Sequence, residues 1–223
     1  CRGAGRASLA TWVRSLWHAT PGRPPAQGVR PTLRMAESRK AAMGSLLCRA
    51  RATRKGIRVV HSIQGADVIK GYVLDLGPKW VLMTAVDGAR LDGYVALRIR
   101  DMESIQPLKA NAFYRKASEL AGVWPPALPE EQIDLATTRG LIETAHAHAN
   151  LVNIQMERDA PDVAFIGVPT RWSKKKVWLN EVDAEAIWDD TVSQWAFEDI
   201  TRVEFSTTYE NDLLLVAGPP PRR

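Results

Sequence analysis

Cysteine is scarce in this sequence of 223 residues: there are two, Cys1 and Cys48, and both lie near the N-terminus. Neither can cross-link the part of the chain in which we expect strands. The core must therefore hold without disulfides, as in proteins of a reducing compartment. This favours a cytoplasmic location, with an organelle as the alternative if residues 1–34 are a transit peptide.

Long apolar runs are missing too. No stretch of about 18 apolar residues occurs, so we expect no membrane-spanning helix. Hydrophobic residues nevertheless make up 45% of the chain, and eight tryptophans are among them. This content is sufficient for a substantial core.

Motifs that mark catalysis are also absent from the sequence. There is no nucleophile elbow, phosphate-binding loop or dinucleotide fingerprint. His146 and His148 are spaced i, i+2 on a predicted helix, where their side chains point to different faces and cannot share a metal ion. The sequence therefore predicts no catalytic residue, no cofactor and no metal site, and it favours a non-catalytic protein over an enzyme.

Acidic residues are almost missing from the first 58 residues, which contain 13 Lys and Arg but one acid, Glu37. Residues 59–223 contain 17 Lys and Arg against 24 Asp and Glu, a net charge of −7. The high isoelectric point therefore comes from the N-terminal segment. We expect residues 1–55 to be a basic disordered segment, with at most a frayed helix after Met35.

Several interpretations of residues 1–34 stay open. In one interpretation the start of translation is placed too far upstream and initiation occurs at Met35 or Met43. In another, the sequence is a fragment. The segment can also be a disordered arm that binds RNA or acidic lipid. Its arginines and serines suit an organellar transit peptide, whereas the apolar run SLATWV is too short and too broken for a secretory signal.

Residues 57–106 predict four or five short strands joined by tight turns. β-Branched residues are frequent over residues 56–63 and apolar positions alternate over 68–76, while Asp87-Gly88 is a strong hairpin signal. Gly71 lies in the middle of a strand, where it allows a sharp bend or a close crossing. The short strands and tight turns indicate a strongly bent sheet.

A helical and proline-rich stretch follows. Three prolines within residues 125–129 indicate a stiff linker, and Thr137 can cap a helix over residues 138–149. An earlier helix is predicted over residues 111–121, with one apolar stripe made of Phe113, Ala117 and Leu120.

Residues 151–218 repeat the outline of residues 56–122. Gly167 lies in a predicted strand as Gly71 does, and corresponding parts follow one another at offsets of 95 to 98 residues, which indicates a duplication. Strands are predicted over residues 151–157, 163–170, 174–181, 184–188 and 193–205, and a helix over 208–217.

The order of these parts resembles the Sm-like, SH3-type small β-barrel. The resemblance is carried by Gly71-Tyr72-Val73, the Trp80-Val81-Leu82 strand, the Asp87-Gly88 turn and the closing strand Asp101-Met102-Glu103-Ser104-Ile105. It implies a mainly β (α+β) fold with two tandem Sm-like or SH3-like barrels, residues 56–122 and 151–218, each followed by a helix. A helical connector over residues 123–150 and a disordered tail over 219–223 complete this organisation. The chain also looks like uncharacterised bacterial proteins that have two such copies, from which no activity follows.

The function expected from this organisation is binding rather than catalysis. We expect a non-catalytic interaction module that binds an unidentified protein through barrel edges or the groove between the barrels. The alternative is RNA binding through a basic turn with an aromatic residue beside it, together with the N-terminal arm. A solvated hairpin tip would show the same charges. The candidate nucleic-acid contacts are Arg171, Trp172, Lys174, Lys175 and Lys176.

Overall fold

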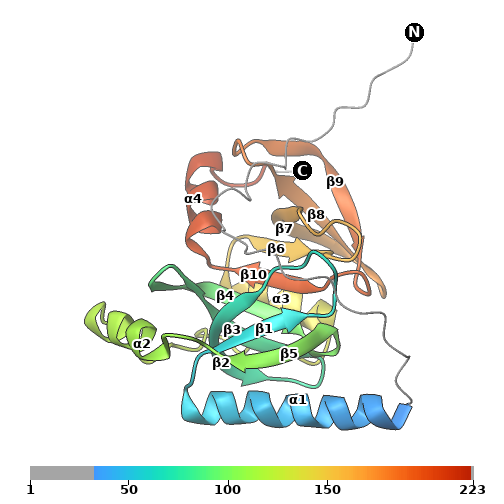
Figure 1. Ribbon diagram of the computed structural model, residues 1–223. Helices are drawn as coiled ribbons and strands as arrows, with labels where there is room; N and C mark the ends of the chain where they lie inside the picture. Colours follow the sequence, from blue (N-terminus) through green and yellow to red (C-terminus); the bar gives the residue numbers. More distant parts are fainter. Residues whose placement is uncertain (1–32, 222–223) are drawn as a thin grey trace.

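The computed structural model describes residues 33–221, and the first half of this part begins with a long helix (Figure 1). The elements of the first half are α1 (Leu33–Thr53), β1 (Ile57–His61), β2 (Ile69–Leu76), β3 (Trp80–Asp87), β4 (Arg90–Arg98), the short 3-10 helix η2 (Ile99–Asp101), β5 (Met102–Pro107) and α2 (Asn111–Leu120).

The second half begins with a capped helix. The Thr137 side chain accepts a hydrogen bond from the Gly140 N–H at 2.9 Å, so the predicted cap is confirmed. The elements of this half are α3 (Thr138–His148), β6 (Val152–Gln155), β7 (Ala164–Trp172), β8 (Lys176–Val182), β9 (Trp188–Ala196), β10 (Arg202–Phe205) and α4 (Thr208–Ala217).

All ten strands belong to one antiparallel sheet in the order β5-β1-β2-β3-β4-β10-β6-β7-β8-β9. The prediction of two closed small barrels with a helical connector is therefore wrong. The physical reason lies in β10, which pairs with β4 of the first half on one side and with β6 on the other. Its hydrogen bonds fuse the halves into a single open sheet.

The two halves nevertheless have the same strand order. Each places its fifth strand beside its first, and each has a bulge after a mid-strand glycine: between Val73 and Asp75 in β2, and between Pro169 and Arg171 in β7. Descent of both halves from one ancestral unit stays a prediction, because strand order and bulges describe geometry alone.

Gly71 and Gly167 occupy matching close crossings. A Cβ atom at Gly71 would lie 2.1 Å from the carbonyl oxygen of Thr84, and one at Gly167 would lie 2.2 Å from that of Asn180. No side chain fits there, so glycine is what lets each half of the sheet bend this sharply.

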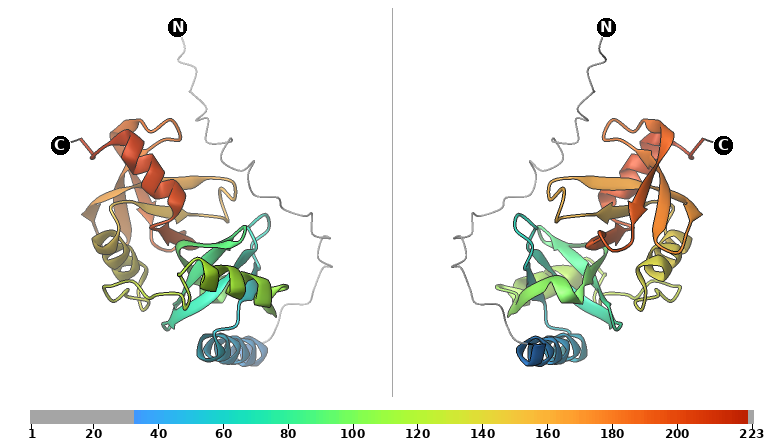
Figure 2. Two further views of the ribbon diagram at one scale, coloured as in Figure 1. Left: turned by 90° about the vertical axis from the view of Figure 1, so that its left-hand side faces the viewer. Right: turned by 90° about the vertical axis from the view of Figure 1, so that its right-hand side faces the viewer.

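The two largest apolar clusters of residues 33–221 pack against the sheet. One lies between α1 and the first half and includes Met43, Leu47 and Ala50 of the helix, which is therefore ordered where we expected disorder or fraying. Figure 2 shows α1 on the side of the first half that faces away from the second. The other core crosses the junction of the halves, because it contains Trp80 and Leu82 as well as α3 and strands of the second half. Residues 1–32 of the predicted basic segment lie outside the described residues.

The helices differ from expectation in how they are placed. The expected apolar stripe of α2 faces solvent: Phe113 is 58% and Leu120 is 77% exposed, whereas Ser118 is buried. The predicted connector, residues 123–150, contributes to the core, since Ile133 and Leu135 are buried. No helix within residues 33–221 is long and apolar enough to cross a membrane.

Replacement of Gly71 by alanine is expected to lower the free energy of unfolding by about 1–3 kcal/mol, because the added methyl group meets a backbone carbonyl that cannot move away freely. Gly44 in α1 is the matched control. A Cβ atom there meets nothing within 4 Å, so Gly44→Ala should stabilise by about 0.5–1 kcal/mol. Urea unfolding of both variants checks the pair, and an unchanged midpoint for Gly71→Ala would contradict the close crossing.

Candidate functional site

The five residues predicted to contact nucleic acid do lie together, at the β7–β8 hairpin. Two of the cations are engaged within the sheet. The Arg171 guanidinium lies 4.1 Å from the centre of the Trp178 ring, and Lys176 Nζ donates to Gln194 Oε1 at 3.3 Å.

The aromatic residue of this turn is also occupied. The Trp172 ring stacks on Phe197 with centres 6.3 Å apart, and the Arg139 guanidinium lies 5.6 Å from its centre. Lys174 and Lys175 are exposed and make no side-chain hydrogen bond or ion pair within the described chain. The turn therefore offers two free ammonium groups, in a half (residues 123–221) that contains seven Lys and Arg against 17 Asp and Glu, a net charge of −10.

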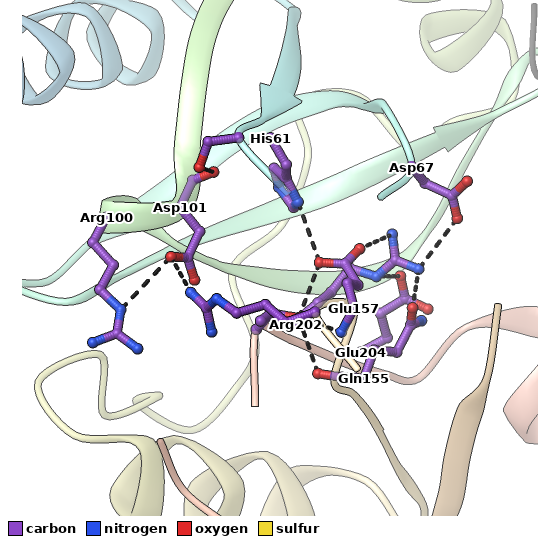
Figure 3. A network of polar contacts seen from close by, with 11 residues as sticks. His61, Asp67, Arg100, Asp101, Gln155, Glu157, Arg202 and Glu204 are labelled. Carbon is purple, nitrogen blue, oxygen red and sulfur yellow. Dashed lines mark hydrogen bonds and ion pairs between the residues drawn. The ribbon is translucent and has the colours of Figure 1, made fainter. Parts of the chain in front are cut away.

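A buried polar network joins the two halves at the fused strands (Figure 3). His61 ends β1 and Glu157 follows β6, and the Glu157 carboxylate lies 3.3 Å from His61 Nδ1. The same carboxylate accepts a hydrogen bond from the Thr201 hydroxyl at 3.0 Å. The His61 and Glu157 side chains are each 1% exposed, so this contact is closed to solvent.

Arg202 of β10 is the central cation of the network. Its guanidinium lies 3.4 Å from a Glu157 oxygen, 3.3 Å from a Glu204 oxygen and 3.4 Å from an Asp67 oxygen, and it donates to Gln155. The side chain is 6% exposed. A buried charge of this kind is tolerated only when partners surround it.

The network shifts the acidity of its members. Burial on its own would raise the pKa of Glu157, but the hydrogen bond from His61 and the charge of Arg202 hold it below the ordinary value. Burial would lower the pKa of Arg202, and the carboxylates of Glu204 and Glu157 raise it instead. Both shifts favour the ionised pair.

A second arginine, Arg98 at the end of β4, is hydrogen-bonded to the turn before β10. Arg98 donates to the carbonyl oxygens of Glu198 at 2.8 Å and Phe197 at 2.6 Å, and it lies 5.0 Å from the centre of the Trp80 ring. Burial lowers the pKa of Arg98 to about 10. This buried cation is held by backbone carbonyls and an aromatic ring, and it also crosses between the halves.

The His61–Glu157 pair has the geometry of a base with an orienting carboxylate, and it links the end of β1 to the residues that follow β6. Both side chains are closed to solvent. Two cavities on the surface are lined by other residues, one beside β1 and β5 and the other beside α4. The network therefore works as a structural joint.

No group of three or more His, Cys, Asp or Glu within residues 33–221 is placed to hold a metal ion. His148 packs edge-on against Tyr94 and Phe205, with ring centres 5.5 and 5.9 Å apart. His146 is partly buried, and burial lowers its pKa. The two histidines on α3 thus have packing roles.

The open edge at β9 is the longest unpaired backbone of the sheet. The Phe197 N–H donates to the Lys175 carbonyl at 2.8 Å, and bonded and non-bonded pairs alternate along an antiparallel ladder. By this alternation the N–H and C=O groups of Val192, Gln194 and Ala196 point away from β8. β9 is nine residues long and contains neither proline nor lysine.

The opposite edge, at β5, is shorter. The Leu108 N–H donates to the Gly56 carbonyl at 2.9 Å, which by the same alternation turns the backbone of Ile105 and Pro107 outward. Pro107 has no N–H, and its place at an outer strand is typical of an edge that resists pairing. Of the two edges, β9 is better suited to accept another strand.

Comparison of the chain with protein-family models, curated proteins and solved structures gives no match. The resemblance to small Sm-like barrels therefore stays a prediction. The residues of the junction network were not among the residues predicted from the sequence. The signal available for them was a polar or charged residue at an inward position of an apolar strand, such as His61 after Val59-Val60 and Arg202 before Val203.

Glu157→Gln should destabilise the protein by about 3–5 kcal/mol, because it leaves the buried Arg202 with one carboxylate fewer and removes the charge facing His61. The lowered pKa of Glu157 means that its contribution is present above the unfolded pKa and disappears as the pH falls through the folded pKa. Denaturant unfolding at pH 7 and pH 4 measures both effects. Glu143→Gln, which breaks an exposed i, i+4 pair with Arg139, is the control and should change stability by less than about 1 kcal/mol.

Glu210 should give the opposite pH dependence. Burial and the nearby Glu204 charge raise its pKa from 4.5 to about 7, so the folded state holds a proton that the unfolded state has lost. Folding stability therefore falls as the pH rises from about 4.5 to 7, by about 1.4 kcal/mol for each unit of pKa shift.

Glu210→Gln tests this expectation, since the amide keeps an oxygen to accept the Thr207 N–H bond of 3.0 Å that caps α4. The variant should be more stable than the native protein at pH 7.5 and about equal to it at pH 4.5. Identical pH profiles for the two proteins would show that Glu210 titrates normally.

Proposed function

We infer that this protein is a non-catalytic interaction module that takes up an extended segment of a partner protein as an added strand along β9. The supporting observation is that β9 and β4 occupy the same position in the strand order of their halves, yet within residues 33–221 only β4 is covered by a further strand. In the first half β10 lies along β4 over four residue pairs. The outward backbone groups of Val192, Gln194 and Ala196 are suited to the same pairing.

The side chains along this edge indicate the chemistry of a partner segment that would fit it. Val192 is 40% exposed and can contact an apolar residue of an added strand. Asp189 and Asp190 at the start of β9 are exposed, and residues 123–221 have a net charge of −10. A partner segment with apolar residues at alternate positions and a positive net charge fits this edge best.

RNA binding at the β7–β8 turn has less support. The Trp172 ring already contacts Phe197 and Arg139, and two lysines carry the free charge of the turn. The surrounding half has a net negative charge, which repels phosphate groups.

Selection from a displayed library of extended peptides, with the full chain as bait, tests the proposal. Bound peptides should slow hydrogen exchange at the backbone amides of Val192, Gln194 and Ala196, because these N–H groups become donors to the added strand. Protection confined to other residues would contradict strand addition at β9.

Gln194→Pro is the matching variant, since it removes an outward N–H while leaving the β8 ladder intact. We expect it to lower the affinity for a selected peptide by at least about tenfold, or 1.4 kcal/mol. Leu215→Lys is the control, because Leu215 lies on α4 and is 82% exposed. It should bind as the native protein does, and equal binding by Gln194→Pro would rule out a contribution of the β9 edge.

A further inference from the structure

A cationic cavity of about 380 Å³ lies on the first half, beside β1, β2, β5 and the start of α2. Its polar lining consists of Arg58, Lys70, Gln106, Lys109 and Tyr114. Three of these side chains are cations, the other two are neutral, and no carboxylate lines the cavity.

The strand register places the cations in one row. Arg58 of β1 pairs with Lys70 of β2 on one side and with Gln106 of β5 on the other. Like charges directly opposite each other on neighbouring strands destabilise a sheet. Lys109, just after β5, adds a third positive charge to the same cavity.

These charges are not neutralised from within the protein. Arg58 Nη1 donates to Gln106 Oε1 at 3.1 Å. Lys70 and Lys109 make no side-chain hydrogen bond or ion pair within residues 33–221, and both are exposed. Within residues 33–221 no carboxylate offsets the repulsion between Arg58 and Lys70, so a bound anion would relieve it.

The polar side chains that line the cavity are mostly hydrogen-bond donors. Because the Gln106 oxygen is taken by Arg58, the amide nitrogen is the group left to face a ligand, and Tyr114 adds a hydroxyl. A tetrahedral dianion with several acceptor oxygens matches three cations and two further donors better than a carboxylate does. The volume lies within the range of small-molecule sites and exceeds what a bare phosphate ion needs.

We propose that the cavity formed by Arg58, Lys70 and Lys109 binds the phosphomonoester group of a small molecule. The site lies at the opposite end of the strand order from β9, so it does not depend on strand addition there. The cations of the cavity recognise the terminal phosphate dianion of the ligand. Tyr114 lies beside the space for the rest of the ligand molecule.

Titration of the full chain with adenosine 5′-monophosphate, inorganic phosphate and adenosine, at constant ionic strength set with chloride, tests this proposal. Backbone amide chemical shifts provide the readout. The monophosphate and phosphate should both shift the amides around residues 58, 70 and 106–109, and adenosine should not. Equal binding of adenosine and its monophosphate, or no binding of either phosphate, would overturn the proposal. The proposal would also be overturned if a short RNA without terminal phosphates bound while adenosine 5′-monophosphate and inorganic phosphate did not.

The Lys70→Gln variant distinguishes specific binding in the cavity from non-specific attraction of an anion by surface charge. The variant should bind the monophosphate at least tenfold more weakly than the native protein, whereas Lys79→Gln, outside the cavity, should bind it equally well. Binding reduced to the same extent in both variants would indicate non-specific charge attraction and overturn the site.

Thermal unfolding gives a second readout that does not use chemical shifts. Without phosphate, Lys70→Gln should melt at a higher temperature than the native protein at low salt, because the repulsion opposite Arg58 is gone. Added phosphate should raise the melting temperature of the native protein and not that of Lys70→Gln. A phosphate-induced rise of equal size in both proteins would contradict the proposal.

Discussion

The burial of Arg202 among carboxylates is the constraint on which the continuity of the sheet depends. β10 has four residues and lies between β4 and β6, so it joins the halves with very little chain. Its residues alternate: Arg202 and Glu204 face the polar network, while Val203 and Phe205 face the apolar core. A slip of one residue would move the guanidinium into that core, which is far more costly than the native arrangement. The ion pairs thus fix the register at the junction.

The two halves that β10 joins have net charges of opposite sign. Residues 33–122 contain sixteen Lys and Arg against eight Asp and Glu, a net charge of +8, whereas residues 123–221 have a net charge of −10. Because β10 covers β4, the edge left open in the acidic half is β9. The cationic cavity lies in the basic half, next to the edge that Pro107 protects. The edge proposed to accept a protein strand and the cavity proposed to bind a small anion therefore lie at opposite ends of the sheet.

Local sequence patterns predicted most of the elements and did not predict how the strands pair. The strand predicted over residues 184–188 is mostly the turn before β9, and the one predicted over 193–205 is the end of β9, a turn and β10. The Asp87-Gly88 turn, the Thr137 cap and the α4 helix over residues 208–217 all occur where the pattern indicates. The mid-strand glycines were also correctly expected to mark close crossings. The two-barrel prediction failed because alternation along a strand shows which side chains turn inward but not which strand supplies the next hydrogen bonds. The junction network was missed for the same reason: His61 and Glu157 are 96 residues apart, and only the pairing of distant strands brings them together.

The amino-acid sequence by itself determined the strands, the turns, the glycine bends and the division into a basic and an acidic part, since these follow from neighbours a few residues apart. The tertiary structure alone decided that ten strands form one sheet, that Arg202 is buried and that β9 is left open. Each of these depends on backbone groups that pair across long separations in the sequence. The short, buried strand β10 can pair with a strand of either half, and here it pairs with both.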